Sequence, residues 1–364
     1  MRAKRLPGAA AGNTGVVPRL RRSDCSAPGI RRRGRGRGVE YLDPDGERID
    51  DPEALERIDA LAIPPAWREV WICLDPLGHL QATGIDAAGR KQYRYHDQWR
   101  ARRDRQKFAD MIDYGRALPR LRRRVTQHLR DDEELTRRRV LACATRLLDL
   151  GFFRIGSEGY AEDNQTYGLA TMLKRHVTVN GSEVVFDYPA KGGQRRVQAI
   201  ADDDVREVVA ELRARRGGGQ ELLAYRDDGS WVDVRSPDIN AYVKELTGGD
   251  FSAKDFRTWN ATVLAGVALA GEANRLDALG RRQTQTSRKR AVTSAVKAVA
   301  AYLGNTPAVC RSSYIDPRVI DRFQSGDTIA ATLERIGGEP DVGDPAKRTR
   351  IEAAVLELLQ DSGD

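Results

Sequence analysis

A predicted β-hairpin limits the choice of fold most, because it interrupts a part of the chain that otherwise has the pattern of helices. Residues 177–188 are typical of two strands joined at Asn180-Gly181, the strongest short-range signal for a tight hairpin. A second turn, with Lys191 near its tip, leads into a third strand through Val197. Apolar residues recur at helical spacing on both sides. The sequence therefore predicts a mainly helical domain with an inserted three-stranded sheet.

The part of the chain before this domain has a different pattern. Short strand-like runs in residues 39–105 alternate with turn residues at 43–46 and 75–78. This predicts a small β-rich domain with one or two helices, followed by the mainly helical domain over residues 106–364. The expected fold class is α+β.

Positive charge is concentrated at the N-terminus. The net charge of the chain is +8. Residues 1–38 contain many arginines but only one acidic residue, Asp24. Residues 31–38 contain only arginine and glycine, so they have nothing apolar to bury and we expect 1–38 to be a disordered tail. Such a tail attracts nucleic-acid phosphates without sequence preference. A solvated leader without function accounts for residues 1–29 equally well.

Membrane insertion, export and metal binding find no support in the sequence. No apolar run is long enough to span a bilayer, and no hydrophobic signal region follows Met1. The four cysteines are far apart and include no paired CxxC spacing: Cys25, Cys73, Cys143 and Cys310. We therefore expect a cytoplasmic protein with reduced thiols, no metal site and no cofactor.

Tyr314 is the candidate nucleophile. A predicted helix stops at Gly304, and Pro307 and Pro317 then bracket Tyr314 in what we expect to be a short irregular link. As one of 11 tyrosines, Tyr314 considered by itself fits a simple packing role better, so only its partners elsewhere in the chain favour a nucleophile. A phenol with a pKa near 10 is ionised to roughly one part in a thousand at neutral pH, so a tyrosine nucleophile needs cations around it.

Candidate cations occur elsewhere in the chain. Attack on a phosphodiester builds negative charge on phosphate oxygens, which guanidinium groups match, and the leaving alkoxide needs a proton from an acid such as lysine. Arg154 follows a predicted helix, Arg257 begins another, and Lys191 lies on the predicted hairpin. Such a site requires no metal.

The order of these motifs resembles the catalytic core of type IB DNA topoisomerases of the compact bacterial and poxvirus-like branch. The motifs run through most of the chain in the family's order: Arg154, Lys191, Lys254-Asp-Phe-Arg257, Gly304-Asn-Thr-Pro307 and Ser313-Tyr314. The resemblance implies that Tyr314 attacks the scissile phosphate and forms a 3′-phosphotyrosyl link. The freed 5′-hydroxyl strand rotates and is resealed, which relaxes supercoiled DNA without ATP or metal.

The resemblance also implies roles for the partners of Tyr314. Arg154 and Arg257 would hold the phosphate oxygens, Lys191 would protonate the departing 5′ oxygen, and Lys254 would lie near the phosphate. Many family members carry a histidine nine residues before the tyrosine, where this chain has Asn305. An amide donates hydrogen bonds but does not titrate near neutrality, so we expect Asn305 to orient and stabilise without transferring a proton.

Two further stretches are candidates for DNA contact. Cations alternate with aromatic and amide side chains in residues 89–100, as in the family's major-groove strand, although a polar edge strand would show the same pattern. A polar turn at 164–167 resembles the family's substrate loop. The residues expected to touch DNA are Arg90, Lys91, Gln92, Tyr93, Tyr95, Asn164, Tyr167 and Lys254.

Two alternatives remain open. A tyrosine recombinase or integrase uses the same residue types, but it usually has His-x-x-Arg where this chain has Lys254-Asp-Phe-Arg257, and its N-terminal domain is helical. A non-catalytic nucleoid-binding protein would explain the basic tail but not the spacing of the motifs. The family resemblance implies a monomer in the nucleoid that closes as a two-lobed clamp around double-stranded DNA without an obligate protein partner.

Overall fold

The computed structural model describes residues 19–35, 38–87, 89–156, 158–159, 161, 165–278, 284–337 and 343–360 of the chain. Contacts between Cα atoms divide it into two compact units, Met1–Lys107 and Phe108–Asp364, with the boundary inside helix α2 (Asp97–Arg130). None of the helices in the described residues is both long and apolar enough to cross a membrane.

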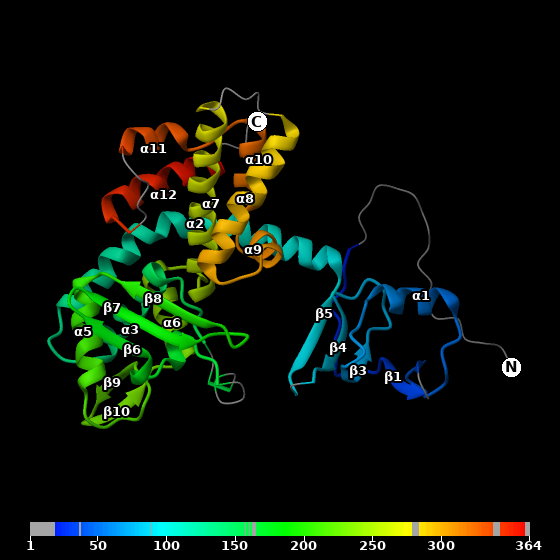
Figure 1. The fold of residues 1–364 in the computed structure, drawn as a ribbon. Helices are drawn as coiled ribbons and strands as arrows, with labels where there is room; N and C mark the ends of the chain where they lie inside the picture. Colours follow the sequence, from blue (N-terminus) through cyan, green and yellow to red (C-terminus); the bar gives the residue numbers. More distant parts are fainter. Residues whose placement is uncertain are drawn as a thin grey trace. The chain divides into compact units, whose positions relative to one another are not determined.

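The first unit is built on a five-stranded antiparallel sheet with the order β2-β1-β3-β4-β5 (Figure 1). Its strands are β1 (Ile30–Arg35), β2 (Gly38–Leu42), β3 (Arg68–Ile72), β4 (Leu80–Ile85) and β5 (Lys91–Tyr95). Helix α1 (Pro52–Ala60) begins where the Asp51 side chain accepts a hydrogen bond from the Glu53 amide. Ile58 from this helix and Ile30 and Ile72 from the sheet are buried together, so one small core holds the unit.

The prediction of disorder is wrong for residues 19–35. Strand β1 pairs with β2 and β3, and the buried side chain of Ile30 anchors it in the core. The Arg32 guanidinium donates hydrogen bonds to the carbonyls of Ile63, Pro64, Pro65 and Trp67. Composition misled the prediction because a strand is held by backbone pairing and needs few apolar side chains of its own. The rest of the expected tail, residues 1–18 and 36–37, lies outside the described residues.

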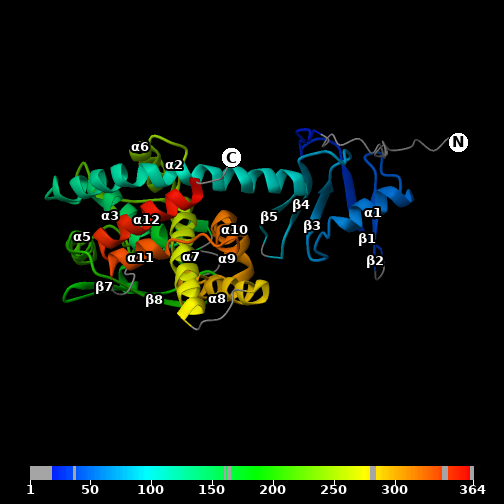
Figure 2. The ribbon, with the colours of Figure 1, turned by 90° about the horizontal axis from the view of Figure 1, so that it is seen from above.

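The second unit is mainly helical. Besides most of α2 it contains α3 (Arg137–Gly151), α5 (Asp203–Ala214), α6 (Ser236–Thr247), α7 (Ala253–Ala278), α8 (Gln285–Leu303), α9 (Pro307–Ser313), α10 (Pro317–Ser325), α11 (Ala330–Ile336) and α12 (Pro345–Gln360). Helix α3 contacts α5, α6 and α7, while α7 lies beside α8, α10, α11 and α12 (Figure 2). The apolar faces of these helices form one continuous core.

The predicted three-stranded sheet is present in this unit, with the order β6-β7-β8. Its strands are β6 (Val177–Asn180), β7 (Glu183–Pro189) and β8 (Arg195–Ile200). Gly181 in the first turn and Gly192 and Gly193 in the second have positive φ, which glycine adopts without strain. The turn that carries Lys191 is therefore sharp. The predicted α+β fold class is confirmed.

A third hairpin, β9 (Ala224–Asp227) with β10 (Ser230–Asp233), was missed by the sequence analysis. Its turn is Asp228-Gly229, a dipeptide as favourable for a tight hairpin as Asn-Gly. The signal was present, but it is short and lies between helices.

Candidate active site

Tyr314 is held at the end of a short helix. Gly304 ends α8 in the left-handed conformation, with φ of 64°. Thr306 then caps α9, in which Pro307 occupies the first turn. The expectation of an irregular link is therefore wrong, because proline at this position starts a helix instead of preventing one. The Tyr314 amide donates to the Cys310 carbonyl at 3.0 Å, and the Tyr314 carbonyl accepts from Thr262 Oγ1 of α7 at 3.4 Å.

Arg154 reaches the end of α8 from a distant part of the chain. Helix α3 ends at Phe152, which adopts φ of 54°, so the chain turns sharply just before Arg154. Arg154 Nη2 donates to the Gly304 carbonyl at 2.9 Å and to Asn305 Oδ1 at 2.5 Å. The guanidinium thereby ties the end of α3 to the segment that leads to Tyr314.

Arg257 occupies the first turns of α7 and is 4% exposed. Its guanidinium donates to the carbonyls of Phe152 and Leu303, and its carbon lies 5.2 Å from the centroid of the Tyr314 ring. Burial lowers the pKa of Arg257, while the Tyr314 phenol opposes this shift and the positive charges of Arg154 and Arg196 add to it. The guanidinium is thus a buried cation directly beside the candidate nucleophile.

One cavity of about 520 Å³ brings together four of the five predicted catalytic residues. Its lining includes Arg154 from the end of α3, Lys191 from the β7–β8 turn, Arg257 from α7 and Tyr314 from the end of α9. Lys254 and Tyr167 line it as well. Two guanidinium groups, two amines and a phenol around one space form a site that is chemically suited to a phosphodiester.

Asn305 does not line this cavity but contacts it through Arg154. Its Oδ1 accepts the hydrogen bond from Arg154, while its buried Nδ2 has no hydrogen-bond partner among the described residues. A buried donor without a partner is costly, and a phosphate oxygen would satisfy it.

Of the two DNA contacts predicted in the polar turn at 164–167, the structure describes Tyr167. The Tyr167 amide donates to the Pro189 carbonyl at 2.8 Å, which fixes Tyr167 beside the turn that carries Lys191. The ring of Tyr167 packs edge-on against His176 with centroids 4.5 Å apart. Asn164 lies outside the described residues.

The remaining predicted DNA contacts lie in the first unit, on the edge strand β5 and in the turn before it. Tyr93 and Tyr95 are exposed on one face with ring centroids 6.2 Å apart, and Lys91 Nζ lies 5.9 Å from the centre of the Tyr93 ring. Gln92 and Arg90 instead contact Asp86, through a 2.8 Å hydrogen bond and a 2.8 Å ion pair. The tyrosines and Lys91 therefore present an aromatic and cationic surface, whereas Gln92 and Arg90 contact Asp86 of the protein itself.

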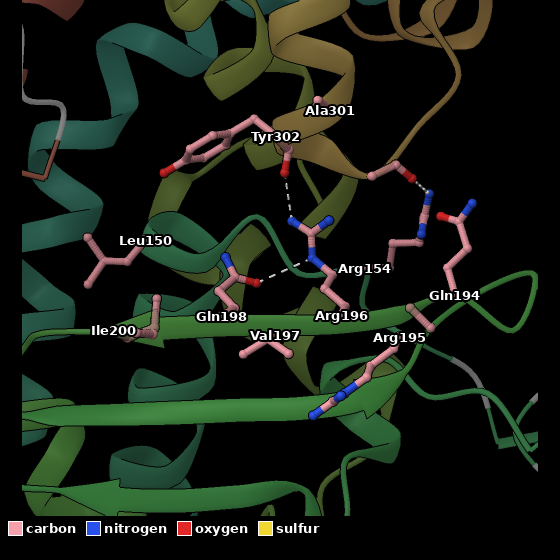
Figure 3. A pocket seen from close by; sticks show the side chains of 13 residues that line it. Leu150, Arg154, Gln194, Arg195, Arg196, Val197, Gln198, Ile200, Ala301 and Tyr302 are labelled. Carbon is pink, nitrogen blue, oxygen red and sulfur yellow. Dashed lines mark hydrogen bonds between the residues drawn. The ribbon is translucent and has the colours of Figure 1, made fainter.

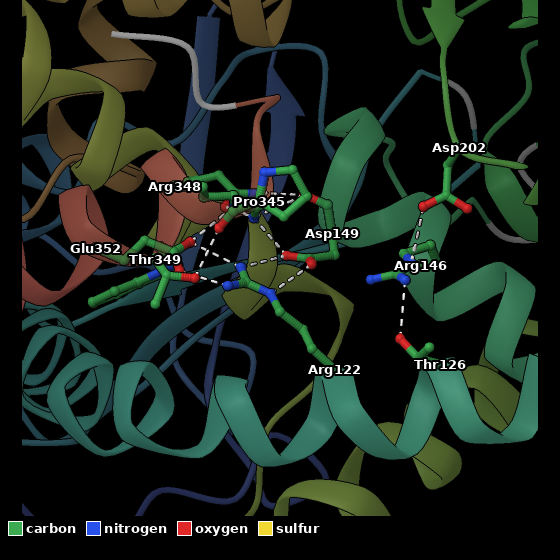
Figure 4. A network of polar contacts seen from close by, with 11 residues as sticks. Arg122, Thr126, Arg146, Asp149, Asp202, Pro345, Arg348, Thr349 and Glu352 are labelled. Atoms are coloured by element: carbon green, nitrogen blue, oxygen red, sulfur yellow. Dashed lines mark hydrogen bonds and ion pairs between the residues drawn. The ribbon is translucent and has the colours of Figure 1, made fainter. Parts of the chain in front are cut away.

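An ionic network that the sequence did not predict links α2, α3, α7 and α12 (Figure 4). Arg122 of α2 makes paired hydrogen bonds to Asp149 of α3 and to Glu352 of α12. Arg348 of α12 contacts Asp149 Oδ1 at 2.6 Å and Asn260 Oδ1 of α7 at 3.1 Å. Asn260 follows Arg257 by about one helical turn, and Asp149 precedes Arg154 by five residues. The network thus joins α7, which carries Arg257, to α3, the helix that ends just before Arg154.

The charges of this network are strongly coupled. Burial by itself would raise the pKa of Asp149, but the charges of Arg122 and Arg348 outweigh it and hold that pKa well below its usual range. Burial would lower the pKa of Arg122, yet Asp149 and Glu352 together raise it. The Asp149 carboxylate and the Arg122 guanidinium are therefore both ionised in the folded protein.

Comparisons with known proteins agree with this geometry. The family described as "Eukaryotic DNA topoisomerase I, catalytic core" matches residues 96–334, and the family described as "Bacterial DNA topoisomerase IB, N-terminal domain" matches residues 38–86. The chain therefore belongs to the type IB DNA topoisomerases, and its first unit carries the N-terminal domain of the bacterial members.

Individual relatives carry the same description. DNA topoisomerase 1B of Acanthamoeba polyphaga mimivirus is 29% identical over 295 residues, which cover 79% of this chain and 84% of the viral protein. DNA topoisomerase 1 of Candidozyma auris is 29% identical over 164 residues, covering 44% of this chain and 20% of the yeast protein. DNA topoisomerase 1 of Daucus carota is 28% identical over 130 residues, which cover 35% of this chain and 15% of the plant protein. The likeness to the viral enzyme thus extends through most of both chains.

Proposed function

We propose that this chain relaxes supercoiled double-stranded DNA and that Tyr314 is its nucleophile. The observation that supports the proposal is the single cavity lined by Tyr314, Arg154, Arg257 and Lys191, which come from four separate elements. A phenol, paired guanidinium groups and an amine around one space are what transesterification at a phosphodiester requires.

In the proposed reaction, the Tyr314 phenol oxygen attacks the scissile phosphorus. The bond between phosphorus and the 5′ oxygen breaks as the phosphotyrosyl bond to the 3′ strand end forms. Arg154 and Arg257 stabilise the charge that develops on the non-bridging oxygens, and Asn305 Nδ2 donates to one of them. Lys191 gives a proton to the departing 5′ oxygen, and the phenol proton leaves to water.

Religation follows the same path in reverse. After the free strand has rotated, its 5′-hydroxyl attacks the phosphotyrosyl phosphorus and Lys191 takes up the hydroxyl proton. The bond from phosphorus to Tyr314 breaks, and the phenolate takes a proton back from water. One phosphodiester bond replaces one phosphotyrosyl bond, so the cycle requires no energy from ATP. The residues in the cavity supply the charge stabilisation and the proton transfer without a metal ion.

The proposal assigns a role to each part of the chain. The β-rich unit, expected over residues 39–105, binds the DNA major groove through Tyr93, Tyr95 and Lys91, and residues 106–364 carry out catalysis. The basic residues of 1–38 add attraction to phosphates. The protein acts in the cytoplasm at the nucleoid as a monomer that clamps one duplex and needs no protein partner.

Plasmid relaxation tests the proposal. Supercoiled plasmid without recombination sites is incubated with the protein in EDTA and without ATP, and relaxed topoisomers are expected. Tyr314→Phe should still bind DNA but neither relax it nor form a covalent adduct. Supercoiling that persists with the wild-type protein would favour a recombinase, and relaxation by Tyr314→Phe would exclude Tyr314 as the nucleophile.

A further inference from the structure

A second cavity, of about 510 Å³, lies between strand β8 and the end of helix α8 (Figure 3). Arg154 lines both this cavity and the one that contains Tyr314. Arg196, Gln194, Gln198 and Tyr302 contribute most of the other polar groups to its lining. A catalytic arginine thus borders a space that the proposed chemistry does not use.

Three successive carbonyls at the end of α8 each accept a hydrogen bond from a different arginine. Tyr302 accepts from Arg196 Nη2 at 2.8 Å, Leu303 from Arg257 Nη2 at 3.1 Å, and Gly304 from Arg154 Nη2 at 2.9 Å. The final carbonyls of a helix lack helical partners and carry partial negative charge. They bind the guanidinium groups without cancelling a full positive charge. Arg196 is therefore part of the same structural unit as the two catalytic arginines.

This arginine cluster, formed by Arg154, Arg196 and Arg257, has no carboxylate partner among the described residues. Burial lowers the pKa of Arg196, and the positive charge of Arg154 contributes to the same shift. By contrast, the partly buried Arg122 and the buried Arg348 both pair with carboxylates. Buried cations without an anion are costly, so the cluster is electrostatically prepared for anions.

The neighbouring residue shows that this arrangement is specific to Arg196. Arg195 precedes it on β8 and also borders the cavity, but its side chain extends to the other side of the strand and makes paired hydrogen bonds to Asp187 (Figure 3). Arg196 faces α8 so closely that a Cβ atom at Gly304 would lie 2.4 Å from Arg196 Nη1. A charged side chain packs against the end of a helix here while its neighbour forms an exposed ion pair.

We propose that Arg196, together with Gln194, forms an accessory phosphate site that holds a phosphodiester of the cleaved strand next to the scissile one. This inference rests on the proposed function, because it assumes that the scissile phosphate lies in the cavity of Tyr314. Successive phosphates of one strand are separated by only about 3.4 Å along the helix axis. A phosphate beside Arg154 therefore brings a neighbouring phosphate toward the other side of the same guanidinium. The accessory contact fixes the register of the strand for attack.

Single-turnover cleavage of suicide duplexes tests this site. Each duplex carries one neutral methylphosphonate at a different phosphate flanking the scissile one, and the proteins are wild type, Arg196→Met and the matched control Arg195→Met. One flanking methylphosphonate should slow cleavage by the wild type and by Arg195→Met about tenfold. This rate factor corresponds to the free energy of one charge-assisted hydrogen bond. The same methylphosphonate should leave Arg196→Met nearly unaffected. Arg196→Lys, which keeps the charge, should retain part of the effect.

Other outcomes would contradict the accessory site or the proposed function. If Arg196→Met slows cleavage by the same factor on every duplex, Arg196 only positions α8 and the accessory site is excluded. If inorganic pyrophosphate inhibits through Arg196 while no methylphosphonate does, the cavity binds a free anion and the assignment to DNA is overturned. A wild-type protein that forms no covalent adduct on the unmodified duplex would overturn the proposed function itself, which no behaviour of the Arg196 variants alone can do.

Discussion

The guanidinium carbon of Arg257 lies 5.2 Å from the centroid of the Tyr314 ring, although the two residues belong to different helices. Arg257 also donates to the carbonyl of Phe152, which caps the end of α3, and to that of Leu303, the last residue of α8. One side chain therefore lies beside the candidate nucleophile and also joins the ends of α3 and α8.

Replacing Arg257 should affect chemistry more than binding. Arg257→Ala is expected to slow single-turnover cleavage at least about 100-fold, since it removes a preorganised cation from the developing charge. Arg257→Lys should recover only part of the rate, because an ammonium lacks the paired donors of a guanidinium. The measurement is covalent adduct formation on a suicide duplex, with DNA affinity determined in parallel. Equal losses in affinity and rate would contradict a role in the transition state.

Asn305 should act as a donor that does not titrate. Asn305→Ala is expected to slow cleavage about tenfold, the rate factor that corresponds to the free energy of one hydrogen bond to a charged group. Asn305→His should restore donation and add a dependence on pH between about 5 and 8 that the wild type lacks. Asn305→Asp is the matched control of equal size, and it should be slower than Asn305→Ala because its charge neutralises Arg154. A pH profile of Asn305→His identical to that of the wild type would count against this role.

The acid sensitivity of the fold should depend on Asp149. The pKa of Asp149 is lower in the folded protein than the value of about 3.9 expected in the unfolded chain. The ionised carboxylate therefore contributes stability that is fully present above about pH 5 and is lost as pH falls toward the folded pKa. In urea unfolding between pH 3 and 7, Asp149→Asn should be less stable than the wild type at neutral pH, and the difference should narrow below about pH 4. A difference that grows on acidification would exclude this assignment.

Arg348 should stabilise the second unit through charge balance. It contacts Asp149 and Glu352, both nearly buried, so Arg348→Met leaves two carboxylates that share Arg122 alone. We expect a loss of about 3 kcal/mol in the free energy of unfolding. The double variant Arg348→Met/Glu352→Gln removes one charge of each sign and should recover part of this loss.

Arg350→Met serves as the control for Arg348, because Arg350 lies exposed on the same helix. Its free energy of unfolding should stay within about 0.5 kcal/mol of the wild type. If Arg348→Met were equally neutral, the network would contribute nothing measurable to stability.

Features that depend on neighbouring residues could be predicted from the sequence. The turn at Asn180-Gly181 and the end of α8 at Gly304 follow from residues that adopt positive φ at little cost. The spacing of apolar residues predicted the helical domain and the inserted sheet. The candidate nucleophile and its cations could be predicted from the motifs and their order along the chain. Attack of a tyrosine on a phosphodiester needs particular residue types, and a sequence shows those types directly. The prediction from local composition was wrong for β1, because backbone pairing with β2 and β3 stabilises that strand.

The tertiary structure alone decided which of these side chains meet. Arg154 bonds to Asn305 across 151 positions of the chain, and Arg122 bonds to Glu352 across 230. No periodicity along the sequence encodes such contacts, because they arise only when several helices pack on one core. Arg196 illustrates the difference. The neighbouring residue, Arg195, is also an arginine, and only the packing of α8 against one side of β8 places Arg196 beside Arg154 and Arg257.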